Sequence, residues 1–209
     1  MNTTKRLQPR KKPAQARSKV TIDAILTASI QVLLRNGLDK FTTTRVAERT
    51  GVSVGTLYQY FPNKEALLYA LLLKHFEMLA KSFETIPKAP PMTLEILSLR
   101  LADAYIAVKM ANVDETKALY MVAGSINQSR LTKDIFLRLD TAIIKALESV
   151  TDARFEDTQT VSFTLLSALA GLSRSTFARM PADTEPLDRL PLEARVLTTA
   201  YLSASACTR

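Results

Sequence analysis

The chain lacks the side chains that most catalytic and metal sites need. Its 209 residues contain no tryptophan, a single histidine, His75, and a single cysteine, Cys207, close to the C-terminus. Histidine clusters, thiol dyads and a disulfide within the chain are therefore excluded. No phosphate-binding glycine loop is present either. We expect no enzyme activity, no cofactor and no metal site, and the solitary thiol favours a reducing, cytoplasmic location.

Glycine, strand patterns and long apolar runs are also scarce. The chain has five glycines, and no stretch alternates apolar and polar residues as a half-buried strand would. The longest apolar run, ALLYALLL from Ala66, is too short to cross a bilayer. No apolar segment follows the basic N-terminus as it would in a secretory signal. These patterns predict an all-α protein that has no membrane partner.

Positive charge is present in excess, and it lies at one end of the chain. Of the 28 basic and 20 acidic residues, twelve basic and three acidic ones lie at or before Lys64, so the remainder is almost neutral. This distribution favours a polyanionic partner that the N-terminal part binds. Charge alone leaves open an anionic membrane surface, or DNA bound without sequence preference.

The segment from Thr42 to Leu68 predicts two short helices joined by a tight turn. Thr42 or Thr43 can cap the first helix, and Gly51 follows where a left-handed residue would end it. Ser53 can cap the second helix. Taken alone, this pattern is also that of a generic helical hairpin with a polar face.

The second of these helices has two different faces. Val54 and Leu57 lie three residues apart and can face inward together. The residues left outside are small at the start of the helix and hydrogen-bonding or aromatic further along: Gly55, Thr56, Gln59 and Tyr60. Such a surface suits a helix that enters the major groove of DNA by its first turn.

The run GVSVGTLYQYFPNKEALL resembles the most characteristic part of the TetR family of bacterial transcriptional regulators. The preceding TTTRVAERT is similar to the second helix of that family, and RSKVTIDAILTASIQVLLRNGLDKF to its first helix and the loop behind it. Together these segments cover about Arg17 to Leu73. The resemblance implies a repressor that binds a palindrome-like double-stranded DNA operator as a homodimer and is released by a small-molecule effector. The alternatives are a transcriptional activator of the same fold and an architectural DNA-binding protein.

Three parts are expected along the chain: a basic flexible tail over residues 1–17, a helix-turn-helix DNA-binding domain over 18–64, and a helical effector-binding and dimerisation domain over 65–209. The first domain would contain three helices, and a fourth helix from Lys64 toward Phe83 would link it to the second domain. The later helices are expected at about 93–111, 115–127, 133–150, 156–179 and 192–206. The tail could lie along phosphates or enter a minor groove, or it could only aid solubility.

The candidate DNA contacts fall into two groups. The resemblance places phosphate contacts at Thr43, Thr44, Tyr58, Tyr60 and Lys64. The positions expected on or beside the base edges are Arg45, Ser53, Val54, Gly55, Thr56 and Gln59. Two alternatives remain open here: Tyr58 and Tyr60 could pack the small core, and Thr56 could only satisfy the helix start.

The resemblance also implies an effector cavity and a dimer interface in the second domain. Residues that mix adaptable apolar surface with polar groups are the candidate cavity lining: His75, Met78, Tyr105, Met110, Tyr120, Met121, Ser125, Asn127 and Phe163. The last two helices carry the candidate interface: Leu165, Ala168, Leu169, Leu172, Val196, Leu197, Ala200 and Tyr201. Ordinary core packing is the alternative for both groups, and His75 could instead face solvent.

Overall fold

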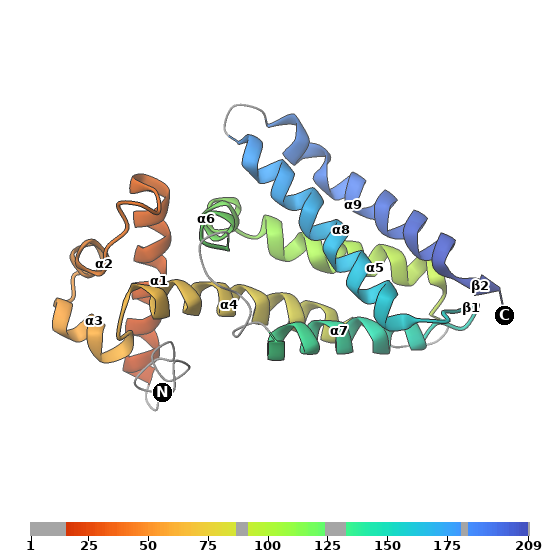
Figure 1. The fold of residues 1–209 in the computed structure, drawn as a ribbon, viewed down its shortest axis with the longest axis horizontal. Helices are drawn as coiled ribbons and strands as arrows, with labels where there is room; N and C mark the ends of the chain where they lie inside the picture. Colours follow the sequence, from red (N-terminus) through yellow and green to blue (C-terminus); the bar gives the residue numbers. More distant parts are fainter. Residues whose placement is uncertain (1–15, 87–91, 124–132, 181–183, 209) are drawn as a thin grey trace. The chain divides into compact units, whose positions relative to one another are not determined.

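A computed structural model describes residues 16–86, 92–123, 133–180 and 184–208, and it confirms the all-α class (Figure 1). The elements in chain order are α1 (Ala16–Asn36), α2 (Thr43–Thr50), α3 (Val54–Tyr60), α4 (Lys64–Glu84), α5 (Leu94–Met110), α6 (Val113–Ala123), α7 (Lys133–Glu148), β1 (Ala153–Arg154), α8 (Thr158–Arg179), α9 (Glu185–Ser205) and β2 (Cys207–Thr208). The strands, of two residues each, form one antiparallel pair. Within the described ranges no helix is long and apolar enough to span a membrane.

The short helices begin and end where the sequence predicts. The Thr42 hydroxyl accepts a hydrogen bond from the backbone N–H of Arg45 at 3.3 Å and so caps α2. Gly51 ends that helix with a φ of 76°, a left-handed conformation that glycine adopts without steric cost. Ser53 caps α3 in the same way, and Asn63 caps α4 through a 2.7 Å bond from the Ala66 N–H. Local chemistry therefore fixes the turn between α2 and α3.

The described residues form two compact units that share α4. The first unit runs to His75 and also includes α6, and the second contains Phe76–Val113 and the chain from Lys133 onward. The core of the first unit is built from apolar side chains of α1 to α4 and of the α1–α2 and α3–α4 connections, each less than 2% exposed: Ile25, Leu33, Phe41, Val46, Ala47, Leu57, Phe61, Ala66 and Leu67. The domain limits given above stay a prediction.

The second unit is a bundle in which α9 packs on α5 and α8, and α8 packs on α7. The start of α5 is tied to the connection after α7, because the Asp152 carboxylate accepts a 2.8 Å bond from the Leu94 N–H. The pair of β1 and β2 holds the end of the chain against the connection between α7 and α8.

One helix boundary differs clearly from the sequence prediction. The final helix was expected from residue 192, after a proline-containing loop, but α9 begins at Glu185 and contains Pro186 and Pro191. Pro186 lies in the first turn, where a backbone N–H has no partner inside the helix in any case. Pro191 lies further in and costs the helix one backbone bond, while Leu190, buried at 1% exposure, and Ala194, at 0%, anchor this part to the core. Tertiary packing thus overrides a local helix breaker.

Candidate DNA-binding surface and ligand cavity

Helices α2 and α3 pack against each other and leave one side of α3 in solvent. Leu57 is fully buried and attaches α3 to the core. Gly55 and Gln59 are exposed, Tyr58 is 39% exposed, and Tyr60 is half-buried. The side chains named for base contact are therefore available to a partner, with Val54 and Thr56 half-buried at the start of the helix.

The hydroxyl groups of Thr43 and Tyr58 lie 3.1 Å apart and share a hydrogen bond. Thr43 is only 8% exposed, whereas Thr44 beside it is exposed. Since the bond joins α2 to α3, Thr43 positions the Tyr58 hydroxyl. A phosphate could accept a bond from that hydroxyl pair, and Thr44 is the freer contact.

Thr56 is engaged with the cap of its own helix. Its backbone N–H donates to the Ser53 hydroxyl at 3.0 Å, and the two hydroxyl oxygens are 2.8 Å apart. The geometry therefore supports a role for Thr56 in capping α3. A contact of Thr56 with a base would have to use its methyl group, or the hydroxyl that already lies beside Ser53.

Lys64 fastens the start of α4 to the connection between α1 and α2. Its ammonium donates to the Leu38 carbonyl at 3.1 Å and lies 5.7 Å from the centre of the Phe41 ring. The half-buried side chain thus keeps a positive charge at the N-terminus of a helix, where backbone amides also favour an anion.

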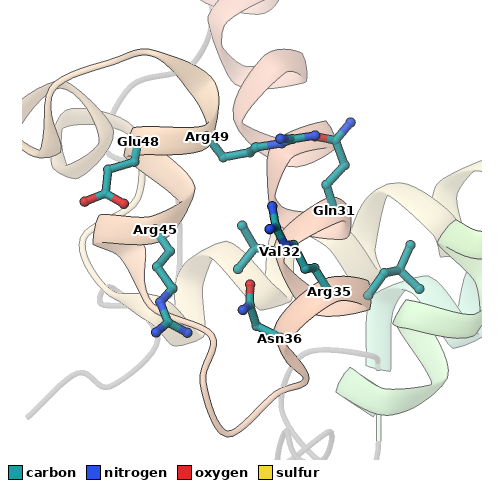
Figure 2. A pocket seen from close by; sticks show the side chains of 8 residues that line it. Gln31, Val32, Arg35, Asn36, Arg45, Glu48 and Arg49 are labelled. Atoms are coloured by element: carbon teal, nitrogen blue, oxygen red, sulfur yellow. The ribbon is translucent and has the colours of Figure 1, made fainter.

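An open concavity on the first unit gathers three arginines from α1 and α2: Arg35, Arg45 and Arg49. Figure 2 shows Arg49 reaching from α2 toward Gln31 of α1, to which its Nε donates at 2.7 Å. Arg45 bends back to donate to the Lys40 carbonyl at 2.8 Å. Arg35 and Arg49 were not expected in a site. The available signal for Arg49 was its four-residue spacing from Arg45 on one face of α2.

The second unit contains a cavity of about 380 Å³ enclosed by α4, α5, α7 and α8. Apolar and aromatic side chains dominate its lining, which also holds one cation and one carboxylate: Phe76, Leu79, Tyr105, Lys109, Phe136, Leu139, Asp140, Phe163, Leu166, Ser167 and Ala170. Tyr105 and Phe163, both predicted for an effector cavity, come together here.

The remaining cavity candidates lie elsewhere. His75, buried at 6% exposure, belongs to the first unit with Tyr120 and Met121. Met78 and Met110 belong to the second unit but do not line this cavity. Ser125 and Asn127 fall outside the described residues.

Apart from Tyr105 and Phe163, the residues that line this cavity were not predicted for it, and Lys109 is the one among them with a shifted pKa. Its side chain is 5% exposed, and the ammonium lies 5.3 Å from the centre of the Tyr105 ring. Burial lowers the pKa of Lys109 to about 8, because an apolar setting penalises the charged form. The available signal was its register, since Lys109 follows Tyr105 by four residues on the apolar stripe of α5.

The candidate interface residues divide by exposure. Leu165 and Leu169 are each 1% exposed within the single chain, so they pack inside the unit. Val196 is 55% exposed and Ala200 is exposed as well, and both lie on α9. The half-buried members are Ala168, Leu172, Leu197 and Tyr201.

Two family models match the chain. The one described as bacterial regulatory proteins of the tetR family matches residues 25–71. The one described as the tetracyclin repressor-like C-terminal domain matches residues 93–202, which is more than half of the chain.

The curated relatives match over about a quarter to a third of the chain. The transcriptional repressor KstR of Rhodococcus jostii is 37% identical over 68 residues, which are 32% of each protein. The tetracycline repressor protein class C of Escherichia coli is 41% identical over 54 residues, which are 26% of this chain and 25% of that protein. The chain therefore spans a third or less of the length of these relatives.

Solved structures match over nearly the whole chain. A TetR-family transcriptional regulator from Mesorhizobium loti aligns with a TM-score of 0.71 at 19% identity, over 91% of this chain and 98% of that one. At this identity the likeness shows the fold alone.

Proposed function

Since the chain belongs to the TetR family of bacterial transcriptional regulators, we propose that it is a repressor that binds a palindrome-like operator as a homodimer and leaves it when a small molecule binds. The observation that carries DNA reading is the pair α2 and α3, joined at Gly51, with Gly55 and Gln59 exposed on α3. A repressor role is supported by the name of the relative KstR, a transcriptional repressor.

The DNA contacts divide into positioning and reading. Lys64, Thr44 and the Tyr58 hydroxyl bind phosphates, which sets the register of the domain on the duplex. Gln59 reads a base edge, since its amide can donate to and accept from adenine together. Gly55 lets the start of α3 approach the groove closely.

A homodimer fits both the reading helix and the surface of the second unit. One short helix reads only a few base pairs, and two copies related by a twofold axis would read two half-sites. Leu192 and Val196 are 59% and 55% exposed on α9, and Gly171 on α8 faces open space. These helices thus offer an apolar face and a point of close approach to a second copy.

Release by a small molecule uses the continuity of α4. Lys64 stands at its first residue, and Phe76 and Leu79, later in the same helix, line the cavity. A ligand that favours another arrangement of Phe76 and Leu79 shifts the population of the state that binds the operator.

Selection of bound sites from random DNA duplexes tests the proposal. A twofold-symmetric consensus is expected, with half-site centres about 34 to 36 Å apart or a modest variant of that spacing. Enrichment of sequences without symmetry would contradict the dimer, and binding without any consensus would favour an architectural protein.

Two variants, each measured on the selected site and on scrambled duplexes, test the assignment of residues to base reading and to phosphate binding. Gln59→Ala should lower discrimination by about 1 to 3 kcal/mol while leaving nonspecific binding unchanged. Lys64→Ala should weaken binding to both duplexes alike. Equal, uniform losses in the two variants would contradict the assignment of Gln59.

A further inference from the structure

The concavity between α1 and α2 carries a net positive charge. The charged residues that line it are Arg35, Arg45 and Arg49, together with one acid, Glu48. All three arginines are exposed. Figure 2 shows the Glu48 carboxylate directed away from Arg35 and Arg49, and among the described residues no ion pair joins this acid to the arginines. The positive charge of this surface is therefore available to an anionic partner.

The three guanidinium groups keep most of their N–H donors for a partner. Arg49 uses its Nε to donate to Gln31 at 2.7 Å. Arg45 uses one terminal nitrogen to donate to the Lys40 carbonyl at 2.8 Å. Within the described residues Arg35 makes neither a hydrogen bond nor an ion pair. Since a guanidinium carries five N–H groups in a planar fork that fits two phosphate oxygens at once, this surface can make several charge-assisted bonds to phosphates.

The concavity lies on the flank of α2 that packs on α1, whereas α3 packs on another flank. Thr43 joins α2 to α3 through Tyr58, and Arg49 joins α2 to α1 through Gln31. When the second helix of a helix-turn-helix lies in the major groove, the first helix crosses the sugar–phosphate backbone. The flank of α2 that faces α1 would then lie beside phosphates outside the base pairs that α3 reads. Arg45 and Arg49 are about 6 Å apart along the helix axis, against about 3.4 Å between neighbouring phosphates of one strand, so they would reach different phosphates.

We propose that Arg35, Arg45 and Arg49 form a backbone-binding surface, the arginine surface, that holds DNA phosphates flanking each half-site of the operator. This inference rests on the proposed DNA-binding function and adds a contact outside the sequence that α3 reads. Such contacts add affinity and fix the register of the domain, but they carry no sequence information. The competing explanation is local: Arg35 and Arg49 each lie in the last turn of a helix, where a positive charge is favourable. That role needs no partner and predicts no effect on DNA binding.

The salt dependence of DNA binding by the full chain tests the arginine surface. Affinity is measured over a salt series on two duplexes: the selected operator alone, and the same operator with about ten further base pairs, or one helical turn, on each side. The parent should bind the extended duplex more tightly and with a steeper plot of log affinity against log salt, by about 0.9 for each phosphate gained. Equal slopes on the two duplexes would overturn the proposal.

Variants assign the steeper slope to particular side chains. Arg35→Gln removes a charge but no hydrogen bond of the described residues, so it should fold normally and lose about 0.9 of slope on the extended duplex for each phosphate that Arg35 holds. The double variant with Arg49→Gln should lose about twice as much, and both should match the parent on the short duplex. Gln31→Ala removes the acceptor of the Arg49 bond but no charge, and Arg154→Gln removes an exposed arginine of the second unit, so both controls should keep the parent slopes. Unchanged slopes in both arginine variants, or equal losses on the two duplexes, would overturn the proposal.

The outcomes separate this inference from the proposed function. If a twofold-symmetric consensus is bound and Arg35→Gln and the double variant change nothing, the regulator stands and the arginine surface fails. If the arginine variants flatten the slope but no consensus exists, the phosphate contact stands and sequence-specific regulation fails. If Arg35→Gln abolishes calorimetric binding of inorganic phosphate while both slopes stay unchanged, the concavity is a small-anion site and the proposal is overturned.

Discussion

At the residue scale, the small size of Gly55 matters for the proposed approach of DNA and is not needed for the fold of α3. A methyl group added there would meet nothing closer than the Ser53 hydroxyl at 3.8 Å, and the residue is exposed in the first turn of α3. We predict that Gly55→Ala unfolds at the same or a higher temperature, by up to about 1 kcal/mol of added stability, because alanine suits a helix better. Its operator affinity should nevertheless fall.

Thermal denaturation and operator titration of the same Gly55→Ala preparation measure the two effects. Ala24→Gly, at an exposed position of α1, is the control: it changes helix propensity in the opposite direction to Gly55→Ala. Unchanged operator affinity in Gly55→Ala would show that DNA does not approach this side of α3 closely.

The lowered pKa of Lys109 predicts how the free energy of unfolding depends on pH. Its pKa is about 8 in the folded chain against 10.5 for an ordinary lysine, so between these values the unfolded chain binds more protons. Stability contributed by this residue should therefore rise with pH through that window, by roughly 3 kcal/mol in total, and stay low below it. Urea unfolding from pH 7 to 10 measures the rise. Lys109→Met should lack that part of the rise and should be more stable than the parent at pH 7.

The residues that sequence predicted correctly are those whose role is set by near neighbours. Thr42, Ser53 and Asn63 cap helices through bonds to backbone only three residues away, so their pattern is visible in the chain. Lys109 and Arg35 line concavities whose other residues come in part from other helices, and no local pattern specifies those residues. No local pattern shows either that Leu165, a candidate for the dimer interface, is only 1% exposed within the single chain.

At the scale of elements, α8 and α9 carry the proposed dimer interface, and Gly171 tests it. Beyond the adjoining residues and backbone of α8 itself, no described atom lies within 4 Å of a Cβ added at Gly171, so Gly171→Leu should leave the protomer folded. A bulky side chain would keep a second copy of α8 at a distance. We predict a weaker dimer by light scattering over a dilution series. Ala107→Leu, on the exposed side of α5, is the control and should dimerise normally.

Helix α9 explains why element boundaries were harder to predict than elements. Proline patterns place its start at residue 192, and the helix begins seven residues earlier, at Glu185. The cost of Pro191 is local, whereas the gain from burying Leu190 and Ala194 depends on α5 and α8. Local sequence patterns show the cost of Pro191 to the helix, but they do not show the free energy gained by burying Leu190 and Ala194.

At the scale of the whole molecule, the basic N-terminus should govern how binding depends on salt. Residues 2–16 contain five of the basic side chains and no acid. Deleting them should weaken operator binding and flatten the plot of log affinity against log salt by up to about 4.5 units of slope, since each phosphate neutralised contributes about 0.9. Replacement by a neutral segment of equal length controls for chain length, and an unchanged slope would show that the segment does not contact phosphates.

The proposed effect of ligand binding on operator binding involves residues of both units. Helix α4 runs without a break from Lys64 to Glu84. The proposed release therefore requires that a ligand among its later residues changes the state of the helix that begins at Lys64. Linkage then requires reciprocity: if a small molecule identified by direct binding to the full chain lowers operator affinity by some factor at saturation, operator DNA must lower the affinity for that molecule by the same factor. For a coupling of about 1 to 3 kcal/mol the factor lies between about 5 and 150. Fluorescence anisotropy of labelled operator and calorimetry of the small molecule give the two factors independently. Tight binding of that molecule with operator affinity unchanged would contradict release by this ligand, because a ligand shifts an equilibrium only by its difference in affinity for the two states.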